Sequence, residues 1–504
     1  MRLLSSPPPR AAAAAAPLRA GAQARAALTA ASPADYTLPA STALQRGVAR
    51  AWLRLALAAL IGSGLFSVLL VLARTPVINA WLPAGDFFRV ALVVHVDLSV
   101  GVWFVAMAGL LWSLNMRAPR SAPMLALTRL PLWLCGAGAA GMALAAFVDP
   151  GQAVMANYIP MLDSATFRGA VAVFGAGTLV LVALALVRAR AVGAAPDGAG
   201  ALRFGIHASV IATAVALLAF GWSLAVVPPE LPTRTYYEVL WWGGGHALQF
   251  TWTLLMLVSW LALAQACGAR LPLSPRVVLL MFMVALASVF VTPLAYLMHE
   301  VGSVEHRDMH TWAMRFGGGV AIVPLVLAVG LALLAARRQV LAPAQRPLRA
   351  ALLASMGLFV AGGVIGLTIG GSNVKIPAHY HGCIVGVTLA LMGLAYHLLP
   401  ALGYAPVQGR AAVLQPWLYG GGQLLHIVGL VWSGGYGVQR KVAGAEQVLR
   451  STAEVAGMGL MGLGGLLAIA GGLLFVIVVW RAMRAGARDA SHADGSLGSA
   501  AAST

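Results

Sequence analysis

The chain has 504 residues, of which 60% are hydrophobic and only 10% are charged. A soluble domain carries about 25% charged residues, so this composition excludes an ordinary soluble protein and indicates a polytopic membrane protein. The formal net charge is +18, yet the basic residues are scattered between apolar runs. That distribution excludes a nucleic-acid-binding stripe and is typical of topology signals.

Both ends of the chain differ in composition from the middle. Residues 1–45 are rich in Ala, Pro and Arg, as transit peptides are, with no acid before Asp35. We expect a disordered cytoplasmic tail there, and a second disordered tail over 486–504. The region between them, 46–485, is predicted to be one membrane domain.

A helix of about 20 apolar residues spans a bilayer. Twelve segments meet this requirement, and the loops between them are mostly short, so we predict an all-α integral membrane protein built as one bundle of twelve transmembrane helices. The predicted spans are 50–74, 88–114, 122–149, 168–189, 204–227, 237–268, 276–300, 312–336, 349–371, 376–400, 412–436 and 453–482.

The basic residues predict the orientation of the bundle. Arg is concentrated before the first span, in every second loop and after the last span, which places both termini in the cytoplasm. With this topology most acids fall on the outer side. The acids on the inner side are in loops or tails, namely Asp35, Asp197, Asp489 and Asp494. No carboxylate falls within the cytoplasmic half of any predicted span.

Five histidines on four predicted spans reach the same outer third of the bundle. They are His95, His246, His299, His379 and His381. Ionisable residues at membrane depth are costly and usually functional, so their shared depth predicts a cofactor or metal site in the bundle core. On a helix, positions i and i+2 point to nearly opposite sides, so His379 and His381 are expected to serve two different centres.

The pattern resembles the catalytic subunits of the haem–copper oxidase superfamily, which comprises terminal oxidases and the related nitric oxide reductases. The resemblance covers about 50–482 and includes the count of twelve spans. It implies that His95 and His381 are the axial ligands of a low-spin haem. It implies that His379 is the proximal ligand of a high-spin haem. His246 and His299 would then hold a second metal facing the high-spin haem.

The resemblance extends to the loop after the eleventh predicted span. Arg440 and Lys441, in "GGYGVQRKVAG", are similar to the basic pair that contacts haem propionates in this family.

The sequence also departs from the family. The family has a second histidine where this chain has Glu300, and two imidazoles plus one carboxylate suit iron(II) better than copper, so Glu300 is a candidate third ligand. His306 and His310 could clasp a metal, but they lie in a polar loop and are expected to be solvated. The tyrosine that many oxygen reductases carry one turn after the sixth-span ligand is Phe250 here, and Tyr296 is the only nearby phenol. The other intramembrane histidines are expected to be structural: His207, His397 and His426.

Three functions remain open. We favour reduction of nitric oxide to nitrous oxide at a haem and non-haem-iron pair. The alternative is an oxidase, fed by cytochrome c or quinol, that reduces oxygen to water at a haem–copper pair. A haem-carrying membrane protein without catalysis is disfavoured by the extra ligands on the sixth and seventh spans. Either enzyme is expected in the inner membrane with an electron-donating subunit or periplasmic cytochrome or copper protein, because the chain has no haem c motif and no paired-cysteine copper site.

Overall fold

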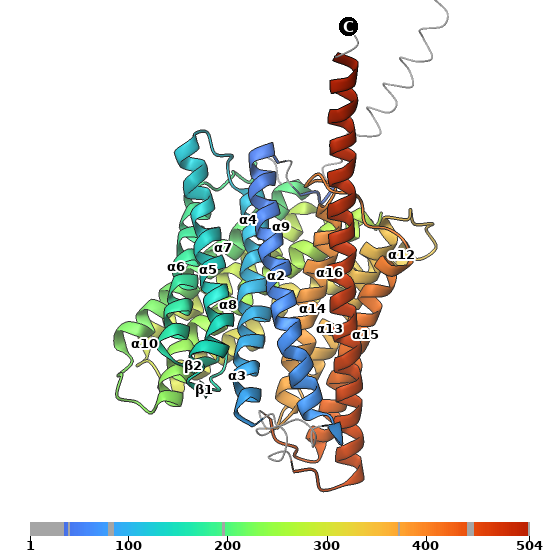
Figure 1. The fold of residues 1–504 in the computed structure, drawn as a ribbon. Coiled ribbons are helices and arrows are strands. Elements are labelled where there is room, and N and C mark those ends of the chain that lie inside the picture. Colours follow the sequence, from blue (N-terminus) through green and yellow to red (C-terminus); the bar gives the residue numbers. More distant parts are fainter. Residues whose placement is uncertain are drawn as a thin grey trace, which may run out of the picture.

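The computed structural model describes residues 35–38, 41–78, 85–193, 197–370, 373–440 and 448–501. These residues form a bundle of long helices that lie side by side (Figure 1). The helices and strands have the following bounds: α2 Ala43–Arg74, α3 Gly85–Val96, η2 Asp97–Val102, α4 Trp103–Asn115, α5 Ala122–Val148, β1 Gln152–Val154, β2 Met161–Asp163, α6 Ala165–Val187, α7 Gly198–Val226, α8 Thr233–Ala266, α9 Pro275–Val289, α10 Val291–Met298, α11 Val304–Trp312, η3 Ala313–Gly317, α12 Gly319–Ala335, α13 Gln345–Gly366, α14 Lys375–Leu398, α15 Arg410–Gly435 and α16 Thr452–Ala501.

Eleven helices within the described residues are long and apolar enough to cross a membrane. Three of them are composite, since α3, η2 and α4 run on as one helix, as do α9 with α10, and α11 with η3 and α12. The predicted all-α membrane bundle is therefore confirmed. The helix of the predicted eleventh span, α15, is not among the eleven.

Helix α15 is long enough to span a bilayer, but glycines and polar residues such as Gln415 and Gln423 lower its hydropathy. Its glycines have another use. A Cβ placed on Gly422 or Gly429 would overlap the backbone of α16, so their absence of a side chain lets the two helices pack in direct backbone contact. Figure 1 shows α15 and α16 side by side through the bundle.

The centre of the bundle is formed by α8 and α14. In the most apolar stretch of each membrane-length helix, 89% of residues are buried for α8 and 78% for α14, the two highest values among the eleven. These helices carry His246 and the His379–His381 pair, so these three histidines lie on the two most buried membrane-length helices.

A short antiparallel hairpin joins α5 to α6. Strand β1 pairs with β2 in the register Gln152 to Asp163 and Val154 to Met161. We call the end of the bundle that carries this hairpin the hairpin end; it lies opposite the free end of α16 (Figure 1).

The loops with the predicted inner-side arginines are joined to one another at the opposite end. The Arg190 guanidinium donates to Gln45 and to the Met116 carbonyl, and the Arg117 amide donates to the Arg188 carbonyl. These loops therefore share one face, as the alternation of basic residues requires. Which face is cytoplasmic stays a prediction.

Both tails expected from the sequence stay predictions. Residues 1–34, most of the expected N-terminal tail, lie outside the described residues, as does Lys441. Helix α16 continues to Ala501, and the disordered tail expected over 486–504 stays a prediction.

Candidate functional site

A cavity of about 1690 Å³ runs through the hairpin half of the bundle, and four of the five predicted site histidines line it: His95, His246, His379 and His381. Pockets for one small ligand hold about 300–1,000 Å³, so this cavity has room for more than one large cofactor. Arg440 also lines it.

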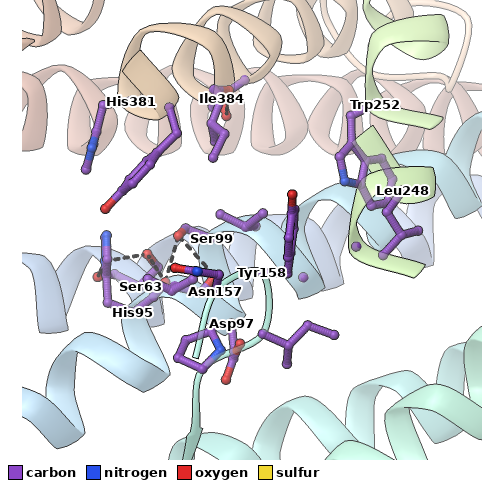
Figure 2. Close-up of a pocket in the computed structure, with 18 of the residues that line it drawn as sticks. Ser63, His95, Asp97, Ser99, Asn157, Tyr158, Leu248, Trp252, His381 and Ile384 are labelled. Atoms are coloured by element: carbon purple, nitrogen blue, oxygen red, sulfur yellow. Dashed lines mark hydrogen bonds between the residues drawn. The ribbon is translucent and has the colours of Figure 1, made fainter. Parts of the chain in front are cut away.

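His95 and His381 lie on opposite sides of the cavity (Figure 2). His95 is held by Ser63, whose hydroxyl and carbonyl oxygens both lie 3.0 Å from Nδ1. The Nδ1–H of His381 donates to the Pro377 carbonyl at 2.8 Å. When Nδ1 is engaged in this way, Nε2 keeps its lone pair for a metal, so both rings are oriented as ligands.

His379 is anchored in a different direction from His381. Its Nδ1–H donates to the carbonyl of Gly362 on α13, 2.8 Å away. Gly366, one turn further along α13, leaves the space that this ring fills, since a Cβ there would lie 2.7 Å from Nδ1. The two histidines of α14 thus have separate anchors, as expected if each serves its own centre.

The fourth cavity histidine, His246, meets two others that sequence reasoning set aside. The His246 ring lies 5.8 Å from the ring of His310, and His310 lies 4.6 Å from His306, measured between centroids. His306 is 0% exposed and His310 is 1% exposed. The expectation that these two residues are solvated is therefore wrong.

Helix α11 is the reason. The sequence pattern suggested a polar loop there, but the chain turns at Gly302 with a φ of 94° and begins a helix at Val304. Ser303 caps it by accepting a hydrogen bond from the His306 amide. This helix runs on into the eighth span, and its i, i+4 spacing places His306 and His310 on the same buried face. In the sequence, Ser303 followed by histidines at i, i+4 spacing was the signal that could have predicted this helix.

Three histidine ring nitrogens on α11 lack hydrogen-bond partners. His310 Nδ1–H donates to the His306 carbonyl at 2.7 Å, but His310 Nε2 and both nitrogens of His306 have no hydrogen-bond partner. Buried polar atoms are nearly always paired, so three unpaired nitrogens beside His246 fit a metal that these imidazoles would hold. The rings are not yet gathered around one point: among the described residues, no three His, Cys, Asp or Glu side chains are already close enough to hold a metal.

The predicted ligands His299 and Glu300 are placed differently. His299 directly follows the last residue of α10 and is half-buried, and Glu300 is exposed. Neither lines the large cavity. The structure thus brings His246 together with His306 and His310 and leaves Glu300 at the surface, because α10 ends one residue before His299 and the chain leaves the bundle there.

A phenol that sequence reasoning missed reaches His246. Tyr158, in the loop between β1 and β2, donates its hydroxyl hydrogen to His246 Nε2 at 2.8 Å. Burial raises the pKa of this phenol, and the nearby Glu238 carboxylate raises it further, so Tyr158 stays protonated. Nδ1–H of His246 donates to the Trp242 carbonyl at 2.8 Å, so Nε2 is the nitrogen left to bind a metal. The Tyr158 hydroxyl occupies that nitrogen in this structure.

Tyr158 is held in place at some conformational cost. Its φ is 68°, a value that non-glycine residues rarely adopt. Its ring fills the space above Gly245, where a Cβ would overlap it. Strained backbone of this kind persists where the surroundings enforce it and is often found at functional sites. Figure 2 shows Tyr158 reaching the cavity from its loop.

Tyr296, the phenol that the sequence did suggest, lies on the other side of the three imidazoles. Its ring packs edge-on against His306, with 4.7 Å between centroids. Its hydroxyl is hydrogen-bonded to the hydroxyl of Ser223, with 2.7 Å between the two oxygens.

A third imidazole lies beside the His95–His381 pair. His426 on α15, expected to be structural, has its ring 5.1 Å from that of His381 and lines the large cavity. Its Nδ1–H donates to the Met461 carbonyl on α16 at 3.0 Å. Glycines one turn to either side of His426 could have signalled this close approach.

Comparisons with known proteins agree with this architecture. Residues 47–474 match the family described as cytochrome c and quinol oxidase polypeptide I. An uncharacterized protein of Rickettsia prowazekii (strain Madrid E) is 28% identical over 86% of this chain and 96% of its own length. An uncharacterized protein of Aquifex aeolicus (strain VF5) is 27% identical over 71% of this chain and 86% of its own length.

A solved structure shares the fold. It is a cryo-EM structure of a haem–copper terminal oxidase dimer, and it superposes with a TM-score of 0.69 at 15% identity, covering 88% of this chain and 84% of that one. The family match spans most of the chain, the fold agrees with it, and the histidines line a cavity large enough for the cofactors. The chain belongs to the cytochrome c and quinol oxidase polypeptide I family, and it is a multi-pass membrane oxidoreductase of the haem–copper oxidase superfamily.

Proposed function

We propose that this protein is a terminal oxidase that reduces oxygen to water at a high-spin haem paired with copper. The observation that carries the proposal is the group of three buried imidazoles, His246, His306 and His310. Three ring nitrogens of His306 and His310 have no hydrogen-bond partner, and the Tyr158 phenol is hydrogen-bonded to His246. Iron(II) with a carboxylate ligand was expected from Glu300, but Glu300 is exposed. An all-imidazole set suits copper, and it also suits iron.

The ligand roles of the remaining histidines follow from their anchors. His95 and His381 would hold the low-spin haem from opposite sides of the cavity, and His379 would hold the high-spin haem. Arg440 lines the same cavity and would neutralise the haem carboxylates together with Lys441.

The bound haems and copper would supply the electron transfer and the binding of oxygen. The residues of the chain fix the ligand nitrogens and keep the Tyr158 hydroxyl beside the site. Each oxygen molecule takes up four electrons and four protons and yields two water molecules. The electrons would come from quinol or from a partner subunit, a periplasmic cytochrome or a copper protein.

The proposal is tested on the purified full-length protein by metal analysis, an optical spectrum and gas turnover. We expect two haem irons and one copper per chain, a high-spin contribution to the spectrum, and rapid oxygen uptake with a reduced donor. Iron in place of copper, together with nitrous oxide production and slow oxygen uptake, would overturn the choice of oxygen.

The second candidate, reduction of two nitric oxide molecules to nitrous oxide and water, is favoured by a different observation. Phe250 stands where many oxygen reductases carry a tyrosine, one turn after the ligand on α8. Nitric oxide reduction needs two electrons and no phenol. The same turnover assay separates the two candidates, because only this reaction yields nitrous oxide.

A further inference from the structure

Helix α11, which carries His306 and His310, is attached to the bundle without an apolar face. The two imidazoles are its buried residues. Its large apolar side chains point outward instead, since Val304 is 69% exposed and Trp312 is 56% exposed. A surface helix normally packs on its neighbours through an apolar stripe, and no apolar side chain of α11 is buried. The position of α11 relative to α8 therefore depends on polar and aromatic contacts.

The backbone can change direction at both ends of α11. Gly302, just before it, has a φ of 94°, a value that favours glycine. The π-helix η3 follows α11 directly and ends at Gly317, and two further glycines come next. Single turns of π-helix often mark functional sites. Side-chain contacts with α8 must therefore fix how closely α11 approaches it.

Trp242 of α8 makes two contacts with Arg307 of α11. The indole Nε1–H donates to the Arg307 carbonyl at 3.3 Å, and the guanidinium carbon of Arg307 lies 4.6 Å from the centre of the Trp242 ring. A guanidinium within about 6 Å of an aromatic face is attracted to it electrostatically. Arg307 is exposed and Trp242 is half-buried, so the contact lies at the edge of the metal site.

Trp242 also holds His246. Its carbonyl accepts the Nδ1–H of His246 at 2.8 Å, and the two rings lie 4.8 Å apart between centroids. Arg307 directly follows His306 in the chain and lies about one turn before His310. One pair of side chains thus connects the ligand on α8 with both ligands on α11.

We propose that Arg307 is a positioning residue for the second metal. Together with Trp242 it holds α11 against α8, and so sets the distance of His306 and His310 from His246. The inference rests on the proposed function in that these three imidazoles hold the metal. It is the same whether that metal is copper or iron.

A direct electrostatic role of Arg307 would have the opposite effect. The guanidinium is positively charged and repels a metal cation, so removal of its charge alone would strengthen metal binding. Loss of a positioning contact would weaken metal binding, because the imidazoles would no longer be held at the right separation. The sign of the change in metal affinity therefore distinguishes the two roles.

The first experiment measures the affinity of the purified full-length protein for its second metal, by competition with a chelator. R307M removes the charge and keeps a long side chain of similar helix propensity. We expect its metal affinity to fall about two- to fivefold, the size of an exposed cation–π contact, with both haem spectra unchanged. R307K should recover part of the affinity. R234M, which removes another exposed arginine, is the matched control and should not weaken binding. Unchanged or stronger binding in R307M would overturn the inference.

The second experiment tests whether Arg307 acts through Trp242. In a W242L background the indole is absent, so R307M should cause no further loss of metal affinity. An equal loss in both backgrounds would show that Arg307 acts by another route, and would also overturn the inference. H310A separates this result from failure of the proposed function. Normal metal affinity in H310A would refute the imidazole ligand set itself, whereas loss of metal in H310A with normal binding in R307M would refute only the role of Arg307.

Discussion

Three unpaired ring nitrogens on His306 and His310 distinguish this site from an ordinary buried helix contact. A buried imidazole that lacks partners costs free energy, about 1–3 kcal/mol per unsatisfied group, and a folded protein tolerates it where a ligand supplies the missing interaction. The same reasoning makes Glu300 a poor ligand, because an exposed carboxylate is already satisfied by water.

We therefore expect H306A and H310A each to lower the content of the second metal by about tenfold or more, with both haems retained, since loss of a ligand costs at least as much as loss of a supporting residue. Metal analysis of the purified variants measures this. E300A is the control and should keep its metal. Loss of metal in E300A with normal content in H306A would restore the His246, His299 and Glu300 set.

The Tyr158 hydroxyl can be removed without disturbing the packing around it. Y158F keeps the ring over Gly245 and deletes the bond to His246, which contributes about 1 kcal/mol to stability. If the protein is an oxygen reductase, we expect oxygen turnover to fall by about tenfold or more with metal content unchanged. Y296F, which loses only its bond to Ser223, is the matched phenol control. Full oxygen turnover in Y158F would show that this phenol takes no part.

At the scale of elements, hydropathy found the spans because a bilayer demands about 20 apolar residues in each, and this demand leaves a strong sequence signal. It failed for α11, where "VEHRDMH" is polar yet helical, since burial there depends on packing against α8 and α10 and not on lipid. The placement of Tyr158 was also beyond prediction, because a six-residue loop with a positive φ carries no periodicity.

The contact between α15 and α16 depends on glycine. We expect G429A to lower the melting temperature, because its Cβ would overlap the α16 backbone and overpacking costs about 1–3 kcal/mol. G421A, on the same helix with open space around it, should not. Thermal unfolding in detergent compares the two. Equal stability of both variants would mean that α15 and α16 are not held at backbone contact.

At the scale of the whole molecule, the family and the common depth of the histidines were readable from the sequence, but the orientation is not fixed by the fold alone. Because the arginine-bearing loops share one face, we expect reporter fusions after residues 120 and 340 to be cytoplasmic and one after 230 to be outside. The opposite pattern would place the hairpin end on the cytoplasmic side.

The last expectation concerns how many cofactors the bundle holds. His379 and His381 have separate anchors on Gly362 and Pro377, and their shared cavity exceeds the room that one ligand requires. We therefore expect H381A to remove a low-spin haem signal and leave a high-spin one, and H379A to do the reverse. H397A, deep on the same helix and absent from the cavity lining, is the control and should keep both. Optical and electron paramagnetic resonance spectra of the three variants distinguish these outcomes. If H379A and H381A both removed the same haem signal and left no second haem, α14 would serve a single centre. Electrons could then not pass from one haem to another across this helix.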